Sequence, residues 1–76
     1  MNRIEQKSEI AGTVWKIEVK PGDRVSEGDT LLILESMKME IPVEATEAGT
    51  VHQILVAEKE EVREGQAVVI VETESA

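Results

Sequence analysis

The chain has 76 residues, of which sixteen are acidic and eight are basic, giving a net charge of −8. This length suits a single small domain over residues 1–76. The acidic balance would repel a phosphate backbone, and Trp15 is the only aromatic residue, so we expect no nucleic-acid binding. The absence of cysteine excludes disulfides and thiolate metal sites.

The N-terminus carries no apolar signal region, and no apolar run reaches the length of a transmembrane segment. We therefore expect a cytoplasmic protein that does not engage a membrane. The first predicted element is an edge strand at residues 3–7, whose charges would discourage pairing with another sheet edge. Residues 13–19 largely alternate between apolar and polar side chains, as a strand with one buried face should.

A turn follows at residues 20–23, where Pro21 presets φ and Gly22 supplies the positive φ that a type II turn requires. The continuous apolar run at residues 31–34 predicts a strand covered on both faces. A second apolar run at residues 41–43 follows so closely that the chain must reverse in a tight hairpin, with Lys38 at its tip. Because Pro42 cannot donate to a ladder, the second strand should lie at an edge or contain a break.

An internal repeat organises the whole chain. Shifting the sequence by 37 positions places the Ala-Gly-Thr-Val of residues 11–14 on the same four residues at 48–51. The half-repeats, about residues 11–36 and 48–73, are each too short to bury a core, so they should pack as a pseudo-twofold pair. Residues 57–60 correspond to the turn at 20–23 but lack Pro and Gly, so we expect the halves to differ there.

Short strands separated by turn signals predict an all-β sandwich or barrel, and no segment demands a helix. We expect the repeated residues to serve the scaffold, including turn glycines that accept a positive φ. These positions are Gly12, Gly49, Val25, Val62, Gly28 and Gly65.

The side-chain inventory argues against an enzyme. His52 is the only histidine and lies in a strand-like run, where we expect it on the surface. The carboxylates have no cleft in which to converge, since a chain this small can hardly form a pocket of several hundred cubic ångströms. We expect Trp15 to cap the core or a strand face, and we expect neither a catalytic residue nor a metal ligand.

Lys38 presents a primary amine between two methionines, where a polar turn would normally recruit Asn, Asp or Gly. The surrounding residues resemble the biotinyl attachment domain, whose modified lysine lies in an (Ala/Ser)-Met-Lys-Met turn that usually follows Glu. The resemblance extends from Ile10 to Glu72. It implies a flattened barrel of two antiparallel sheets related by a pseudo-twofold, with the modified lysine on a hairpin at one end and both termini toward the other.

The resemblance also implies a function. A biotin protein ligase would join biotin to Lys38 by an amide bond, and the arm would carry a carboxyl group between the active sites of a biotin carboxylase and a carboxyltransferase. The domain itself would catalyse nothing and would be a monomer when free. Met37 and Met39 would either be read by the ligase or pack onto the barrel end, while Glu35 and Ser36 would complete the turn and bear on recognition.

Two alternatives stay open at the level of sequence. A lipoyl domain shares this fold, repeat and hairpin lysine, so Lys38 could carry lipoate instead of biotin, or both, for a 2-oxoacid dehydrogenase. The usual lipoyl turn is Asp-Lys-Ala, however, whereas this chain has Met-Lys-Met. The other alternative is an unmodified interaction module of the lipoyl-like type.

Overall fold

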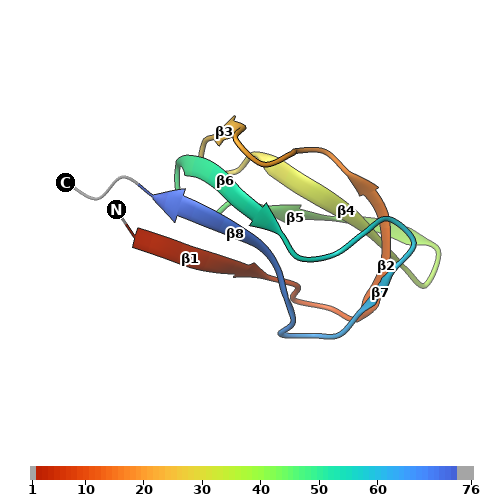
Figure 1. The fold of residues 1–76 in the computed structure, drawn as a ribbon. Helices are drawn as coiled ribbons and strands as arrows, with labels where there is room; N and C mark the ends of the chain where they lie inside the picture. Colours follow the sequence, from red (N-terminus) through yellow and green to blue (C-terminus); the bar gives the residue numbers. More distant parts are fainter. Residues whose placement is uncertain (1, 74–76) are drawn as a thin grey trace.

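The computed structural model describes residues 2–73, which form an elongated domain of β-strands and turns (Figure 1). The strands are β1 (Asn2–Lys7), β2 (Gly12–Ile17), β3 (Arg24–Val25), β4 (Thr30–Ser36), β5 (Met39–Glu44), β6 (Gly49–Ile54), β7 (Glu61–Val62) and β8 (Ala67–Thr73). They make two antiparallel four-stranded sheets, with strand orders β1-β8-β6-β3 and β5-β4-β2-β7. The predicted all-β fold is confirmed. No helix within residues 2–73 is long and apolar enough to cross a membrane.

The two sheets are related by a pseudo-twofold, because each strand of the first half lies 37 residues before its counterpart in the second. The pairing of Thr13 with Glu35 in one sheet thus corresponds to the pairing of Thr50 with Glu72 in the other. Strands β1 and β5 occupy equivalent edges of the two sheets, which confirms the predicted edge positions of residues 3–7 and of the strand containing Pro42.

The core lies between the sheets and consists almost entirely of aliphatic side chains. Its fully enclosed members, all with less than 2% of their surface exposed, are Leu31, Leu32, Leu34, Val14, Val51, Val68, Val69 and Val71. The prediction that residues 31–34 are covered on both faces is wrong, because Ile33 lies half-buried on the outer face. A register shift between Thr30 and Leu32 explains the apolar run, since a bulge turns two consecutive side chains inward.

The turn at residues 20–23 has Gly22 at φ 96° and a 3.1 Å hydrogen bond from the Asp23 N–H to the Lys20 carbonyl, as a type II turn predicts. Residues 57–60 differ from this turn in lacking Pro and Gly, yet they share its backbone conformation, because Lys59 adopts φ 73° at the position of Gly22 and the Glu60 N–H donates to the Ala57 carbonyl at 3.1 Å. The same side-chain contact supports both turns: the carboxylate of the fourth residue, Asp23 or Glu60, accepts the N–H of the first residue at 3.0 Å.

Close backbone approach explains the glycines at the start of β2 and β6. A Cβ on Gly12 would lie 2.8 Å from the carbonyl oxygen of Glu35, and one on Gly49 would overlap the carbonyl oxygen of Glu72. These glycines therefore let the first strands of each half lie tightly against β4 and β8. Gly28 and Gly65 instead occupy turns, at φ 90° and 83°.

Candidate functional site at the β4–β5 turn

Lys38 lies in a two-residue turn that closes the β4–β5 hairpin. Ser36 at the end of β4 pairs with Met39 at the start of β5, so Met37 and Lys38 alone form the connection. Their φ angles are 51° and 67°, which are the two positive values of a type I′ turn. The predicted hairpin tip is therefore confirmed. The turn lies at one end of the domain, and the start of β1 and the end of β8 lie at the other (Figure 1).

The side chains at this turn face solvent. Met37 is 90% exposed and Met39 is 63% exposed, and Lys38 is exposed between them. Within residues 2–73 no ion pair or hydrogen bond engages the Lys38 ammonium. Neither methionine joins the buried core, so the alternative in which they pack onto the barrel end is not what the structure shows. Of the other predicted residues, Glu35 is exposed and Ser36 is half-buried.

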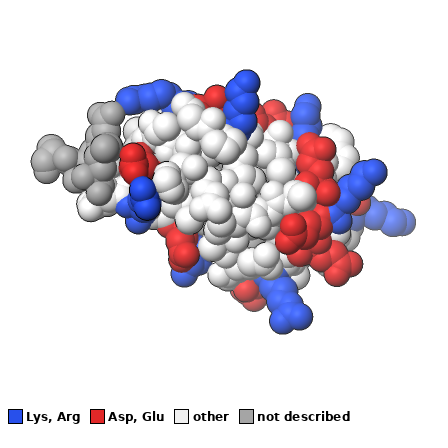
Figure 2. All heavy atoms as spheres, in the orientation of Figure 1, with Lys and Arg blue, Asp and Glu red and all other residues white. Residues whose placement is uncertain are grey.

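A row of carboxylates crosses the outer face of the β5-β4-β2-β7 sheet beside this turn. Glu40 lies directly opposite Glu35, which lies opposite Thr13, which in turn lies opposite Glu61. The three glutamates are exposed and have no ion-pair partner in the part of the chain that the structure describes. Figure 2 shows acidic side chains gathered toward this end of the molecule. We call Glu35, Glu40 and Glu61 the acidic row.

The twofold-related row in the other sheet contains both basic and acidic residues. Its members are Arg3, Glu72, Thr50 and Arg24, paired in the same register. Arg3 Nε lies 3.2 Å from Glu72 Oε2. Because the same positions accept ion-paired residues in one half, the fold itself does not require the unpaired carboxylates of the other half.

The remaining predicted residues lie away from the turn. His52 is exposed in β6, as expected, at a position where the register shifts between Val51 and Gln53. Trp15 occupies the equivalent irregularity in β2 and is 49% exposed, so it does not cap the core. No group of His, Cys, Asp and Glu within residues 2–73 could hold a metal ion.

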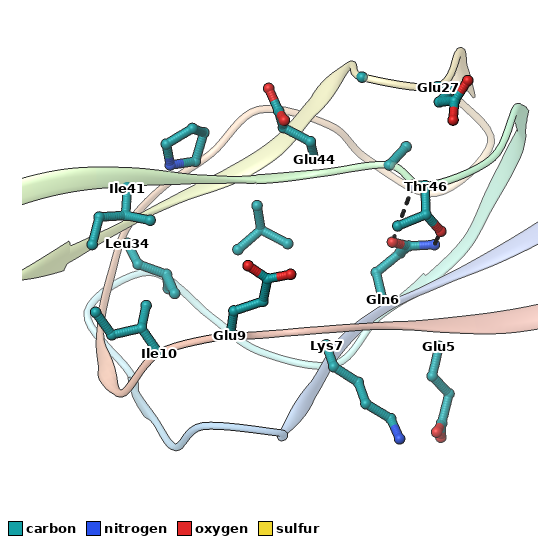
Figure 3. Close-up of a pocket in the computed structure, with 14 residues that line it drawn as sticks. Glu5, Gln6, Lys7, Glu9, Ile10, Glu27, Leu34, Ile41, Glu44 and Thr46 are labelled. Carbon is teal, nitrogen blue, oxygen red and sulfur yellow. Dashed lines mark hydrogen bonds between the residues drawn. The ribbon is translucent and has the colours of Figure 1, made fainter.

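A groove of about 570 Å³ lies between the edge strands β1 and β5, so the expectation that this chain could not form such a space is wrong (Figure 3). Gln6 and Thr46 bridge it with two hydrogen bonds of 3.1 and 3.3 Å. Glu9 points into the space, whereas Glu5 and Lys7 point away from it (Figure 3). The groove forms because two strands far apart in the sequence flank the same opening. The described residues that line it include no histidine, cysteine or serine.

The sequence matches the model of the biotin/lipoyl family, described as biotin-requiring enzyme, over residues 6–71. It is 54% identical over 37 residues to the biotin/lipoyl attachment protein of Bacillus subtilis, covering 49% of this chain and 51% of that one. It is 56% identical over 39 residues to the biotinylated protein TB7.3 homolog of Mycolicibacterium smegmatis, covering 51% of this chain and 55% of that one. The matches thus span about half the length of these curated relatives.

The fold is also found inside a much larger carboxylase. The structure of Kluyveromyces lactis urea carboxylase superimposes with a TM-score of 0.88 and 35% identity, over 93% of this chain and 6% of that protein. The family match covers most of this chain and includes the hairpin with its Met-Lys-Met turn. The chain therefore belongs to the biotin-requiring enzyme family.

Proposed function

We propose that this chain is a biotin carboxyl carrier in which the Lys38 amine receives biotin through an amide bond. The observation that carries the proposal is the position of Lys38, exposed on a two-residue turn at the end of the domain opposite the start of β1 and the end of β8. The site fits a covalently attached arm, since no described side chain engages the amine and the turn leaves its approach open. The biotin-requiring family and the biotinylated relative support biotin as the attached group.

The backbone of the turn supports a functional role for its side chains. A non-glycine residue in the left-handed region costs about 1 kcal/mol or more, and Asn-Gly would fit a type I′ turn at less cost. Met37 and Lys38 both adopt this conformation. Backbone strain of this kind concentrates at functional sites. We infer that the turn retains Met37 and Lys38, together with Met39, because a ligase reads them.

The remaining residues provide a rigid platform. Acylation requires Lys38 to lose a proton to a base on the ligase and to attack an activated acyl donor. When attached to Lys38, biotin would supply the carboxyl-carrying chemistry through its ureido ring. The chain contributes a stable core and a fixed tether, which raises the local concentration of the arm at both sites. The domain would itself catalyse neither step.

The partners follow from this role. The match to a domain of urea carboxylase supports partners of the carboxylase type. We propose a biotin protein ligase, a biotin carboxylase and a carboxyltransferase as the enzymes that meet the Lys38 end. The free chain would be a monomer.

The test is acylation by a purified biotin protein ligase with biotin and ATP. The parent should gain one biotin on Lys38, and Lys38→Arg should gain none while keeping the melting temperature of the parent. Lys59→Arg is the matched control, since Lys59 is also an exposed turn lysine with a positive φ of 73° but has no flanking methionines. Biotin on Lys59, or an unmodified parent, would contradict the proposal.

Lipoate is the second candidate for the attached group. The Bacillus subtilis relative is named as a biotin/lipoyl attachment protein, which makes a parallel reaction with a lipoate ligase informative. Lipoylation of Lys38 without biotinylation would show that the chain is a lipoyl carrier and not a biotin carrier. Acylation by both ligases would identify a dual acceptor.

A further inference from the structure

The methionines of this chain are distributed unusually. The sequence has three, of which Met37 and Met39 bracket Lys38, while Met1 lies outside the described residues. The core contains only Val, Leu and Ala, with Ile and Val packed against it. Since the chain also lacks cysteine, all sulfur atoms within residues 2–73 belong to the two methionines at the proposed attachment turn.

These thioethers are open to a dissolved oxidant. Met37 is 90% exposed on the turn, and Met39 is 63% exposed at the start of the edge strand β5. Oxidation of methionine usually damages a protein by placing a polar sulfoxide in an apolar core. Here neither side chain contributes to the core, so their oxidation should leave the fold unchanged.

We propose that Met37 and Met39 form a peroxide-sensitive modification site that controls the acylation of Lys38. The proposal rests on the function proposed above. In each event a sulfur lone pair attacks one oxygen of hydrogen peroxide, so that an S–O bond forms and the O–O bond breaks. The sulfur loses two electrons to the peroxide, and the departing hydroxide takes up the proton left on the transferred oxygen, which gives water and the neutral sulfoxide. The product is methionine sulfoxide, which methionine sulfoxide reductases convert back to the thioether.

The surrounding charges favour a neutral oxidant. Glu35 and Glu40 lie directly opposite each other beside the turn, and neither has an ion-pair partner within residues 2–73. Their negative potential would repel an anionic oxidant, whereas hydrogen peroxide carries no charge. Hydrogen peroxide is therefore an oxidant whose approach these carboxylates would not oppose.

Oxidation would oppose recognition in a definite way. Each sulfoxide places a strong dipole beside Lys38, where the thioether offered a soft apolar contact. An enzyme surface shaped for that contact would have to bury a polar oxygen without a hydrogen bond, which is unfavourable. We expect kcat/KM for biotinylation of the doubly oxidised chain to fall about tenfold or more.

The experiment treats the chain with hydrogen peroxide, removes the oxidant and then adds biotin protein ligase, biotin and ATP. Peptide mapping should show one added oxygen on each of Met37 and Met39. The thermal melt should match that of the untreated chain, and kcat/KM should fall. Reduction by methionine sulfoxide reductases A and B, followed by repeat mapping, should return kcat/KM to its starting value.

The control is the double variant Met37→Leu, Met39→Leu, which retains Met1 and apolar side chains of similar volume at the turn. Whatever its own rate, the ratio of treated to untreated kcat/KM should stay near one. The proposal is overturned if sulfoxide at both positions leaves kcat/KM unchanged, if the double variant loses as much activity as the parent, or if neither methionine reacts. An untreated parent that the ligase never acylates would instead refute the proposed function.

Discussion

Replacing Glu40 by arginine should stabilise the domain, because the present pair of carboxylates opposes folding. Glu40 on β5 lies directly opposite Glu35 on β4, and both are exposed. At the twofold-related positions the other sheet has Arg3 opposite Glu72, with Nε and Oε2 3.2 Å apart. Glu40→Arg would therefore reproduce, beside the Lys38 turn, an arrangement that this backbone already accommodates.

The magnitude follows from the geometry of cross-strand pairs. An opposite-charge pair contributes roughly 0.2–1 kcal/mol and a like-charge pair is unfavourable by a similar amount. The Arg3 side chain in the reference pair is 60% exposed, so solvent screening reduces the gain. We expect the free energy of unfolding to rise by about 0.5–1 kcal/mol. For a domain of this size that corresponds to roughly 2–8 °C in melting temperature.

The assay is thermal denaturation followed by circular dichroism, with Glu44→Arg as the control. Glu44 lies on the same strand and changes the net charge equally, but it faces Thr30 instead of a carboxylate. At low ionic strength, Glu40→Arg should raise the melting temperature more than Glu44→Arg does. This difference in melting temperature should shrink in about 1 M salt, where the Debye length is roughly 3 Å. Equal shifts in the two variants, or an excess that salt leaves unchanged, would refute the reasoning.

Further substitutions test other parts of the account. Lys59→Gly should raise the free energy of unfolding, measured in urea, by about 0.5–1 kcal/mol, because glycine adopts a positive φ without strain. Gly22→Ala at the equivalent position should lower the free energy of unfolding by about 1 kcal/mol. A lower free energy of unfolding in both variants would contradict the equivalence of the turns. Gly49→Ala should lower the free energy of unfolding by about 2 kcal/mol or more, because its Cβ would overlap the Glu72 carbonyl oxygen. A urea midpoint equal to that of the parent would show instead that β6 and β8 can move apart at this position. Lys38→Arg should leave the urea midpoint within about 0.5 kcal/mol of the parent while abolishing acylation, so an unfolded variant would contradict its surface position.

The sequence contains enough local information to predict the architecture. The repeated Ala-Gly-Thr-Val segments mark the starts of β2 and β6, where glycine is needed for close approach to β4 and β8. The short apolar stretches mark strands and the Pro21-Gly22 turn marks a break between them, so the all-β fold follows from turn chemistry and alternation. The Met-Lys-Met segment between two strands similarly places Lys38 at a hairpin tip.

Features that depend on register or on distant strands could not be predicted in this way. The acidic row requires knowing that Glu61 on β7 pairs with Thr13 on β2, two residues from opposite halves of the chain. The irregularity at Trp15 shifts which residues oppose one another, and alternation alone does not reveal it. The positive φ of Lys59 was not predicted because no glycine or proline marks this turn, in which the Glu60 carboxylate accepts the Ala57 N–H.

The central claim is that Lys38 carries biotin, and the most direct measurement is the intact mass of the protein purified from its native host, followed by peptide mapping. The account predicts a mass increase of one biotinyl group, located on Lys38 and absent from Lys59. A lipoyl group on Lys38 would show that the chain is a lipoyl carrier and does not transfer carboxyl groups. An unmodified Lys38 in cells with an active biotin protein ligase would contradict the claim.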